Sequence, residues 1–232
     1  MTETVLHPIA HMESDFGTKF GIPRQSGMVK ELKSRIVFEP EYRQIETLRG
    51  IDEFSHLWLI WQFSENVGAE WSPTVRPPRF GGNIRQGVFA TRSPFRPNFL
   101  GLSCVRLEAV EEKKGYGLTL LVSGADLMDG TPIFDIKPYL PYSDCISDAK
   151  DGFAPRPEFT LDVVFADGVL EKIPEEKQQA LRKVLMCDPR PRYHDDADRI
   201  YGMEFAGRDV RFRVEGTVLT VLEINKLSPR EQ

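Results

Sequence analysis

The stretch FSHLWLIWQF, residues 54–63, is an almost continuous run of apolar and aromatic side chains in a chain of 232 residues. Its length is that of a β-strand, and its composition predicts a strand buried on both faces. Pro- and Gly-bearing loops separate it from other expected strands, and this pattern favours a barrel or a sandwich. A helix that follows Pro40 and ends at Gly50 is an alternative for the segment before it. The further strands are expected at residues 34–38, 87–90, 103–110 and 116–123.

The composition changes toward the C-terminus. Residues 144–158 are polar and carry Pro and Gly, so we expect a linker between a first domain, 1–143, and a second, 159–232. The second domain is predicted to be a small α+β unit, and its limited core should lean on the first domain or on a second subunit. Its expected elements are a strand at 159–165, a helix at 174–187 and a meander at 200–205, 210–214 and 218–224.

Overall composition is that of a soluble globular protein, with 41% hydrophobic and 28% charged residues. No stretch approaches the roughly 18 apolar residues of a membrane span. The first residues, MTETVLHPIAHMESDF, show neither a basic leader nor an apolar core, so a cytoplasmic protein is expected. Cys104, Cys145 and Cys187 are odd in number and widely spaced, which excludes a complete disulfide framework and the CxxC spacing of a metal site.

Positive charge is concentrated between Trp71 and Leu107, although the formal net charge of the chain is -5. This segment contains six arginines and no Asp, Glu or Lys. Guanidinium groups match the oxygens of carboxylates and phosphates and stay charged near neutral pH, so an anionic ligand is predicted. The alternative is a solvated loop whose arginines pair with distant acids. The arginines are Arg76, Arg79, Arg85, Arg92, Arg96 and Arg106.

Three other segments combine rigid backbone with polar groups. In FGIPRQSG, residues 20–27, Pro23 fixes the backbone ahead of Arg24 and Gln25. In DLMDGTPIFDIKPYLP, residues 126–141, Asp135 and Lys137 would face the same side of a strand and form an ion pair. The DLMDG string is also a common turn sequence.

The third segment is DPRPRYH, residues 188–194. Its prolines would hold Arg190 and Arg192 as stiff, exposed donors suited to phosphates. Alternatively, these arginines pair with Asp188, Asp195 or Asp196.

Several common mechanisms lack their sequence signature. The chain has no GxSxG string of a hydrolase elbow, no GxxxxGK[ST] phosphate loop and no GxGxxG dinucleotide turn. No arrangement of residues indicates a metal centre or covalent catalysis.

Six strings carry a family resemblance: PRQSG, LRGIDEFSHLWLIWQF, TVRPPRFGGN, GVFATRSPFRPN, DLMDGTPIFDIKPYLPY and DPRPRY. In this order they closely resemble the TsaA-like family, in particular its tRNA methyltransferases that use S-adenosylmethionine. The resemblance is strong over residues 5–142 and weaker beyond. It implies a mainly β protein with some α structure, whose N-terminal β-barrel domain holds the cofactor and whose C-terminal domain is small and α+β. It also implies a homodimer that methylates N(6)-threonylcarbamoyladenosine beside the anticodon of threonine tRNA.

The resemblance also implies roles for individual residues. Cofactor contacts are expected from Pro23, Arg24, Gln25, Ser64, Glu65, Arg92, Leu102 and the backbone of Ala125, Asp126 and Leu127. The attacking nitrogen belongs to a urea-like group and needs a base, and Asp126 or Asp129 is expected to serve. Contacts with tRNA are expected from Arg76, Arg79, Arg85, Arg96, Lys137, Arg190 and Arg192, with the C-terminal domain contributing.

Two other functions fit the same residues. One is a module that binds S-adenosylmethionine or a nucleotide without catalysis. The other is a methyltransferase built on the same barrel that acts on a different substrate. Methylation of tRNA by the purified protein would separate the leading hypothesis from both.

Overall fold

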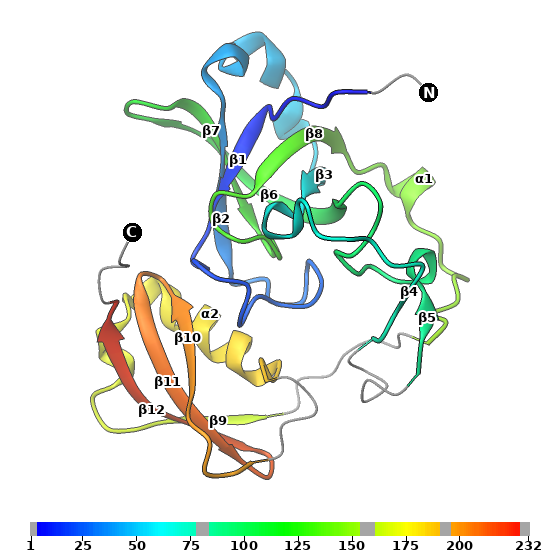
Figure 1. Cartoon of the computed structure of the whole chain (residues 1–232). Coiled ribbons are helices and arrows are strands. Elements are labelled where there is room, and N and C mark those ends of the chain that lie inside the picture. Colours follow the sequence, from blue (N-terminus) through cyan, green and yellow to red (C-terminus); the bar gives the residue numbers. More distant parts are fainter. Residues whose placement is uncertain (1–3, 78–83, 154–160, 191–195, 228–232) are drawn as a thin grey trace.

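The structure is a computed structural model that describes residues 4–77, 84–153, 161–190 and 196–227. Figure 1 shows a β-rich N-terminal unit and a smaller C-terminal unit that lies against one end of it. The prediction of a mainly β protein with few helices is confirmed.

Six strands of the N-terminal unit form a closed barrel, in which each strand pairs antiparallel with two neighbours. Their apolar inward side chains fill a single core. In order around the ring the strands are β1 (Ala10–Glu13), β2 (Lys33–Phe38), β7 (Gly117–Ser123), β6 (Leu100–Lys113), β3 (His56–Gln62) and β8 (Pro132–Pro138).

The aromatic strand β3 corrects one expectation. Leu57, Leu59 and Trp61 point into the barrel and are buried, whereas the alternate residues are only half-buried. A closed ring has one interior, so a strand that belongs to it buries one face. The expectation of burial on both faces is therefore wrong, because apolar residues also occupy the outer positions.

Two local predictions are also corrected. The segment after Pro40 forms three short 3-10 helices, Pro40–Tyr42, Ile45–Leu48 and Ile51–Glu53, in place of one helix. Gly50 has a φ of 81° and precedes the last of them.

The expected strand at 87–90 is the end of β5 (Gln86–Gly87) followed by a 3-10 turn, Val88–Ala90. Within the described part of the chain, β5 pairs with β4 (Thr74–Val75) in a two-stranded sheet. A short helix, α1 (Pro141–Asp144), ends at the first residue of the expected linker.

Neighbouring strands of the ring are antiparallel, so β1, β3 and β7, which alternate with the other three strands, run in the same direction. The three long connections that follow them therefore emerge at the same end of the barrel. They are residues 14–32, which we call the β1–β2 loop, residues 63–99 and residues 124–131. Segments far apart in the sequence therefore meet at this end of the barrel, which the C-terminal unit also approaches (Figure 1).

The C-terminal unit contains a four-stranded sheet and an α-helix, α2 (Glu175–Met186), as the sequence predicts, and a 3-10 helix, Leu170–Lys172, precedes α2. Its core also takes in Phe16, Val29 and Leu32 of the β1–β2 loop. The expectation that this unit leans on the N-terminal unit is confirmed. In sheet order its strands are β10 (Tyr201–Phe205), β11 (Arg208–Glu215), β12 (Val218–Lys226) and β9 (Asp162–Phe165).

Among the helices that the structure describes, none has the length and apolarity needed to cross a membrane.

Candidate active site

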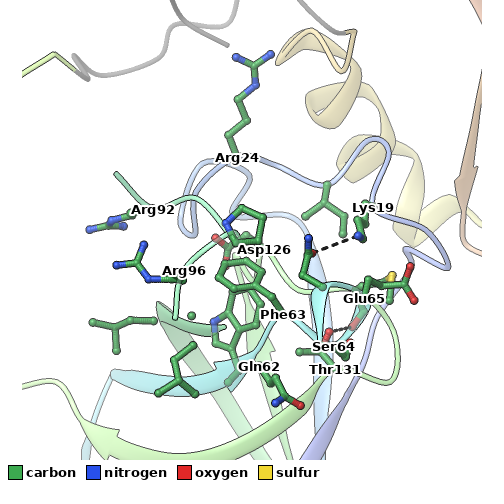
Figure 2. Close-up of a pocket in the computed structure, with 18 of the residues that line it drawn as sticks. Lys19, Arg24, Gln62, Phe63, Ser64, Glu65, Arg92, Arg96, Asp126 and Thr131 are labelled. Carbon is green, nitrogen blue, oxygen red and sulfur yellow. Dashed lines mark hydrogen bonds between the residues drawn. The ribbon is translucent and has the colours of Figure 1, made fainter. Parts of the chain in front are cut away.

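A cavity of about 360 Å³ opens where the three long connections meet. The β1–β2 loop, the arginine-bearing segment (residues 71–107) and the connection between β7 and β8 (residues 124–131) each line part of it. Residues at the end of β3 and at the start of β6 line the rest. Figure 2 shows Arg92 and Arg96 on one side and Lys19, Ser64 and Glu65 on the opposite side. The wall thus combines apolar and aromatic surface with charges of both signs.

Asp126 is the acidic group held most firmly in this wall. Its Oδ1 accepts a hydrogen bond of 2.5 Å from the Ser103 hydroxyl, which in turn accepts a bond of 2.9 Å from the indole N–H of Trp61. Burial of the carboxyl raises the pKa of Asp126, against the opposing effects of the Ser103 bond and the Arg92 charge. This group is therefore a stronger base than an exposed aspartate, and neighbouring side chains fix its position.

The absence of a side chain at Gly101 leaves room for the Trp61 ring at the place from which its indole N–H donates to Ser103. A Cβ at residue 101 would lie 2.3 Å from Cε2 of the indole ring, far inside van der Waals contact. Phe63 meets the Trp61 ring edge-on, with centroids 4.4 Å apart. The ring that donates to Ser103 is thus held by packing as well as by its hydrogen bond.

Arg92 and Gln25 come together at the cavity mouth from positions 67 residues apart. The Arg92 guanidinium donates to the Gln25 side-chain oxygen at 2.5 Å. Arg96 donates to the carbonyl oxygens of Thr91 at 2.9 Å and Ser93 at 3.3 Å, which orients its guanidinium within the loop. Among the described residues of the arginine-bearing segment, Arg106 alone pairs with an acid within 4 Å, with Glu108 at 3.4 Å. The cavity therefore carries positive charge available to an anion.

The loop that carries Pro23, Arg24 and Gln25 is fixed to the barrel by its backbone. The N–H of Gly27 donates to the carbonyl of Gly124 at 2.8 Å, and a Cβ at Gly124 would lie 3.2 Å from the Gly27 Cα. Gly124 also has a φ of 76°, a conformation that favours glycine. The predicted PRQSG segment thus lies beside the chain that enters Asp126.

Most predicted cofactor residues line one cavity: Pro23, Arg24, Gln25, Ser64, Glu65, Arg92, Leu102 and Asp126. Ala125 and Leu127 flank Asp126, and their side chains lie in the barrel core. Leu102 lies on the outer face of β6 and is 52% exposed. Arg24 extends away from the other labelled side chains (Figure 2) and donates to the carbonyl of Arg190 at 3.5 Å.

Asp129 is not among the residues that line the cavity. Its carboxylate accepts a hydrogen bond of 3.0 Å from the backbone N–H of Ser14, and its own N–H donates to the Phe16 carbonyl. These bonds hold the start of the β1–β2 loop. Of the two predicted bases, the structure places only Asp126 at the cavity.

The predicted tRNA contacts are dispersed. Arg96 lines the cavity, whereas Arg76 and Arg85 are exposed in the connection after β3. Lys137 pairs with Asp135 at 2.9 Å, as expected from their spacing. Arg79 and Arg192 lie outside the described residues.

The expectation that Arg190 is an exposed donor is wrong. Its side chain is only 12% exposed and forms two bonds with the Asp188 carboxylate, at 2.9 and 3.0 Å. Asp188 has a φ of 51°, a turn in the chain that brings its carboxylate back to Arg190. The alternative pairing with Asp188 is the one found.

Several residues at the cavity were not predicted individually, because a sequence string does not show which of its side chains face the cavity. Trp61 and Phe63 end the aromatic run and could have been found only by knowing which strand end borders the cavity. Ser103 is buried behind Asp126, and nothing in SCVRL distinguishes it from a core residue. The other lining residues are Lys19, Ile22, Gln62, Asn66, Thr91, Pro94, Leu100, Gly101, Met128 and Thr131. Among the described residues, no cluster of His, Cys, Asp and Glu could hold a metal ion.

Comparison with known proteins assigns both units. The tRNA-methyltransferase O N-terminal domain matches residues 11–145, and the TrmO C-terminal domain matches residues 158–227. The tRNA (adenine(37)-N6)-methyltransferase of Escherichia coli K12 is 38% identical over 99% of this chain and 100% of its own length. The enzyme of the same name from Eikenella corrodens is 47% identical over 70% of this chain and 92% of its own. A solved structure of TrmO from Pseudomonas aeruginosa superposes with a TM-score of 0.79 at 32% identity, over 98% of this chain and 99% of that one. The chain belongs to the tRNA-methyltransferase O family.

Proposed function

We propose that this protein transfers a methyl group from S-adenosylmethionine to the N6 nitrogen of adenosine 37 in tRNA. The observation that carries the proposal is the Asp126 carboxylate, raised in pKa and held by Ser103 in the wall of a cavity that also presents Arg92. Full-length similarity to tRNA (adenine(37)-N6)-methyltransferases supports the same activity.

The cavity suits the chemical groups of S-adenosylmethionine. Trp61, Phe63 and Leu102 offer apolar surface for an adenine ring, and the arginines offer partners for a carboxylate. Glu65 and Asp126 are acids that suit an ammonium or sulfonium cation. We therefore assign cofactor contacts to the lining residues Pro23, Gln25, Ser64, Glu65, Arg92 and Leu102, with the backbone of 125–127 beside them. The lining residues of this site all belong to the N-terminal unit, residues 1–143, and the unit after the 144–158 linker contributes to tRNA binding.

Asp126 acts as the base in this proposal. S-adenosylmethionine supplies a methyl group already activated by its sulfonium, so the protein mainly aligns the reacting atoms. The nitrogen to be methylated is a poor nucleophile while it keeps its proton. Asp126 takes that proton, and the hydrogen bond from Ser103 keeps the carboxylate oxygen in place between turnovers.

The substrate is adenosine 37 that already carries a threonylcarbamoyl group, in threonine tRNA. The modification adds a carboxylate, which an arginine can bind through two parallel hydrogen bonds. Arg96 lines the cavity and its guanidinium is oriented by backbone carbonyls, which supports its assignment to this group. The exposed Arg76 and Arg85 would meet tRNA phosphates.

The activity is tested by incubation of the protein with methyl-labelled S-adenosylmethionine and total tRNA, followed by mass spectrometry of the nucleosides. Label in a methylated N6-modified adenosine from position 37 is the expected result. Cofactor binding without any methylated nucleoside would identify a non-catalytic binding module. Label in a different nucleoside would indicate another substrate.

Replacement of Arg92 by Ala is expected to weaken binding of S-adenosylmethionine by about 1.5–3 kcal/mol, the range for a lost charge-assisted hydrogen bond. Calorimetry on the protein without RNA measures the effect. Arg106→Ala is the matched control, because Arg106 belongs to the same segment but pairs with Glu108 away from the cavity. Equal affinity of the two variants would contradict the assignment of Arg92.

The protein is further proposed to be a homodimer. On the outer face of the barrel, Leu102 pairs in register with Ile60 and leaves apolar surface in solvent beside the cavity. A second copy would cover this surface and complete the site. Sedimentation is expected to give the mass of a dimer for the wild type and of a monomer for Leu102→Glu; a monomeric wild type would reject the proposal.

A further inference from the structure

The β1–β2 loop is fixed to the barrel at its ends. Near its start, the N–H of Ser14 donates to Asp129 at 3.0 Å, and near its other end the N–H of Gly27 donates to Gly124 at 2.8 Å. Between these two anchors the loop supplies five of the residues that line the cavity. They are Lys19, Ile22, Pro23, Arg24 and Gln25.

The middle of the loop packs into the C-terminal unit. Phe16 meets Phe205 edge-on with centroids 5.6 Å apart, and Phe20 stacks parallel to Phe212 at 6.4 Å. Ile22 lines the cavity and also packs against the hydrophobic core of the C-terminal unit. One side chain therefore joins the cavity to that core.

Gly21 lies against the side chain of Met203 in the C-terminal unit. A Cβ at this residue would lie 2.0 Å from Sδ of Met203, a buried residue of β10, and the φ of Gly21 is 96°. The loop backbone thus rests on the Met203 side chain immediately before the chain enters Ile22 and Pro23. A shift of Met203 would move the residues that line the cavity.

Polar contacts attach the same loop to helix α2 and to the sheet. Lys177 pairs with Asp15, whose side chain is 9% exposed, and Lys183 pairs with Glu31 at 2.8 Å. The backbone N–H of Ala206 donates to the Asp15 carbonyl at 2.9 Å. Both halves of the loop are therefore tied to the C-terminal unit.

We propose that the C-terminal unit is a structural part of the cofactor site, with Met203 and Lys177 as positioning residues that set the cavity-lining part of the β1–β2 loop. This inference rests on the proposed function for the identity of the ligand. It assigns to the C-terminal unit a role separate from tRNA contact. Neither Met203 nor Lys177 lines the cavity, so each acts through the loop.

The test measures binding of S-adenosylhomocysteine to the full chain by calorimetry, at a temperature where circular dichroism shows every variant folded. Met203→Ala and Lys177→Ala are expected to raise Kd about fivefold or more, a typical size for coupling between separate sites. Lys177 is 37% exposed, so its replacement leaves the hydrophobic core intact.

Arg182→Ala is the matched control. Arg182 lies on the same helix, but its guanidinium donates to the carbonyl of Val163 at 2.8 Å and covers the Phe165 ring, both within the C-terminal unit. Its Kd is expected to stay near the wild-type value. An equal rise in Arg182→Ala, or an unchanged Kd in the other two, would overturn the inference. Failure of the wild type to bind would instead reject the proposed function.

A double-mutant cycle gives a sharper test. Gly21→Ala is expected to weaken binding strongly, because its Cβ meets Met203 and because a φ of 96° disfavours Ala. Met203→Ala removes the steric part of this loss, so the double variant is expected to bind better than Gly21→Ala alone, though not as well as Met203→Ala alone. Simple addition of the two losses would show that the contact does not set the loop. A second readout is hydrogen exchange in β10, which ligand binding should slow if the coupling is reciprocal; unchanged exchange would argue against it.

Discussion

Asp126→Asn is expected to lower the rate of methyl transfer by about 10²–10⁴-fold, the usual contribution of a positioned general base. Asn keeps the shape of the side chain and can still accept the Ser103 hydrogen bond, but it cannot take a proton. Affinity for S-adenosylhomocysteine is expected to change far less. Single-turnover methylation of tRNA, with calorimetry beside it, measures the two effects separately.

Asp129→Asn provides the matched comparison, because Asp129 is the same residue type only three positions away. Its carboxylate binds the Ser14 backbone outside the cavity, and an Asn oxygen can accept the same bond. We expect a small effect on the rate. If Asp129→Asn loses as much activity as Asp126→Asn, the assignment of the base is wrong.

Asp126→Asn is also expected to change the stability of the protein and the pH dependence of that stability. Burial raises the folded-state pKa of Asp126 above the unfolded value of about 3.9. Its favourable contribution is therefore present below that unfolded value and is lost as pH rises through the folded value. Above its folded-state pKa the wild type carries a buried charge that Asn lacks, so the Tm of Asp126→Asn should rise relative to the wild type as pH increases, and the difference should shrink in acid. Thermal unfolding across pH would contradict this if the Tm difference did not grow with pH. For the wild type, the rate should fall at the acidic end as Asp126 becomes protonated.

Transfer RNA that lacks the threonylcarbamoyl group is expected to be methylated at least about 100-fold more slowly than tRNA that carries it, in kcat/KM. Two causes act together. The arginines at the cavity lose the carboxylate that they bind, and the charge-assisted hydrogen bonds to it are not replaced within the site. The plain adenine amine also offers a different nucleophile. Parallel time courses on the two tRNAs measure the ratio.

Arg96→Ala should reduce this discrimination between the two tRNAs, because it removes the proposed partner of the carboxylate. Arg106→Ala should retain it, since Arg106 does not line the cavity. Equal methylation of the two tRNAs by the wild type would show that the threonylcarbamoyl group is not recognised. A discrimination that survives in Arg96→Ala would place its recognition elsewhere.

Local features of the chain were readable from the sequence. The alternation and length of apolar runs predict most of the barrel strands, the helix at 174–187 and the C-terminal meander, because these patterns depend on neighbouring residues. The excess of arginine in one segment predicts a binding site for an anion. The long shared strings indicate the family, and they place most of the predicted cofactor residues in what proves to be one cavity.

Other features depend on contacts between distant residues, and only the tertiary structure decides them. Asp126 and Asp129 are chemically identical, and they differ because Ser103, which accepts a hydrogen bond from Trp61, donates to Asp126 across the barrel, whereas Asp129 accepts from the Ser14 backbone. Arg190 was predicted as an exposed donor with pairing to Asp188 as the alternative, and a backbone turn decides for the pairing. Ile22 joins the cavity to the C-terminal core, although about 180 residues separate it from Met203 in the same core. Burial and pKa are set by what surrounds a group in space, so the sequence determined which residues could act and the fold decided which of them meet.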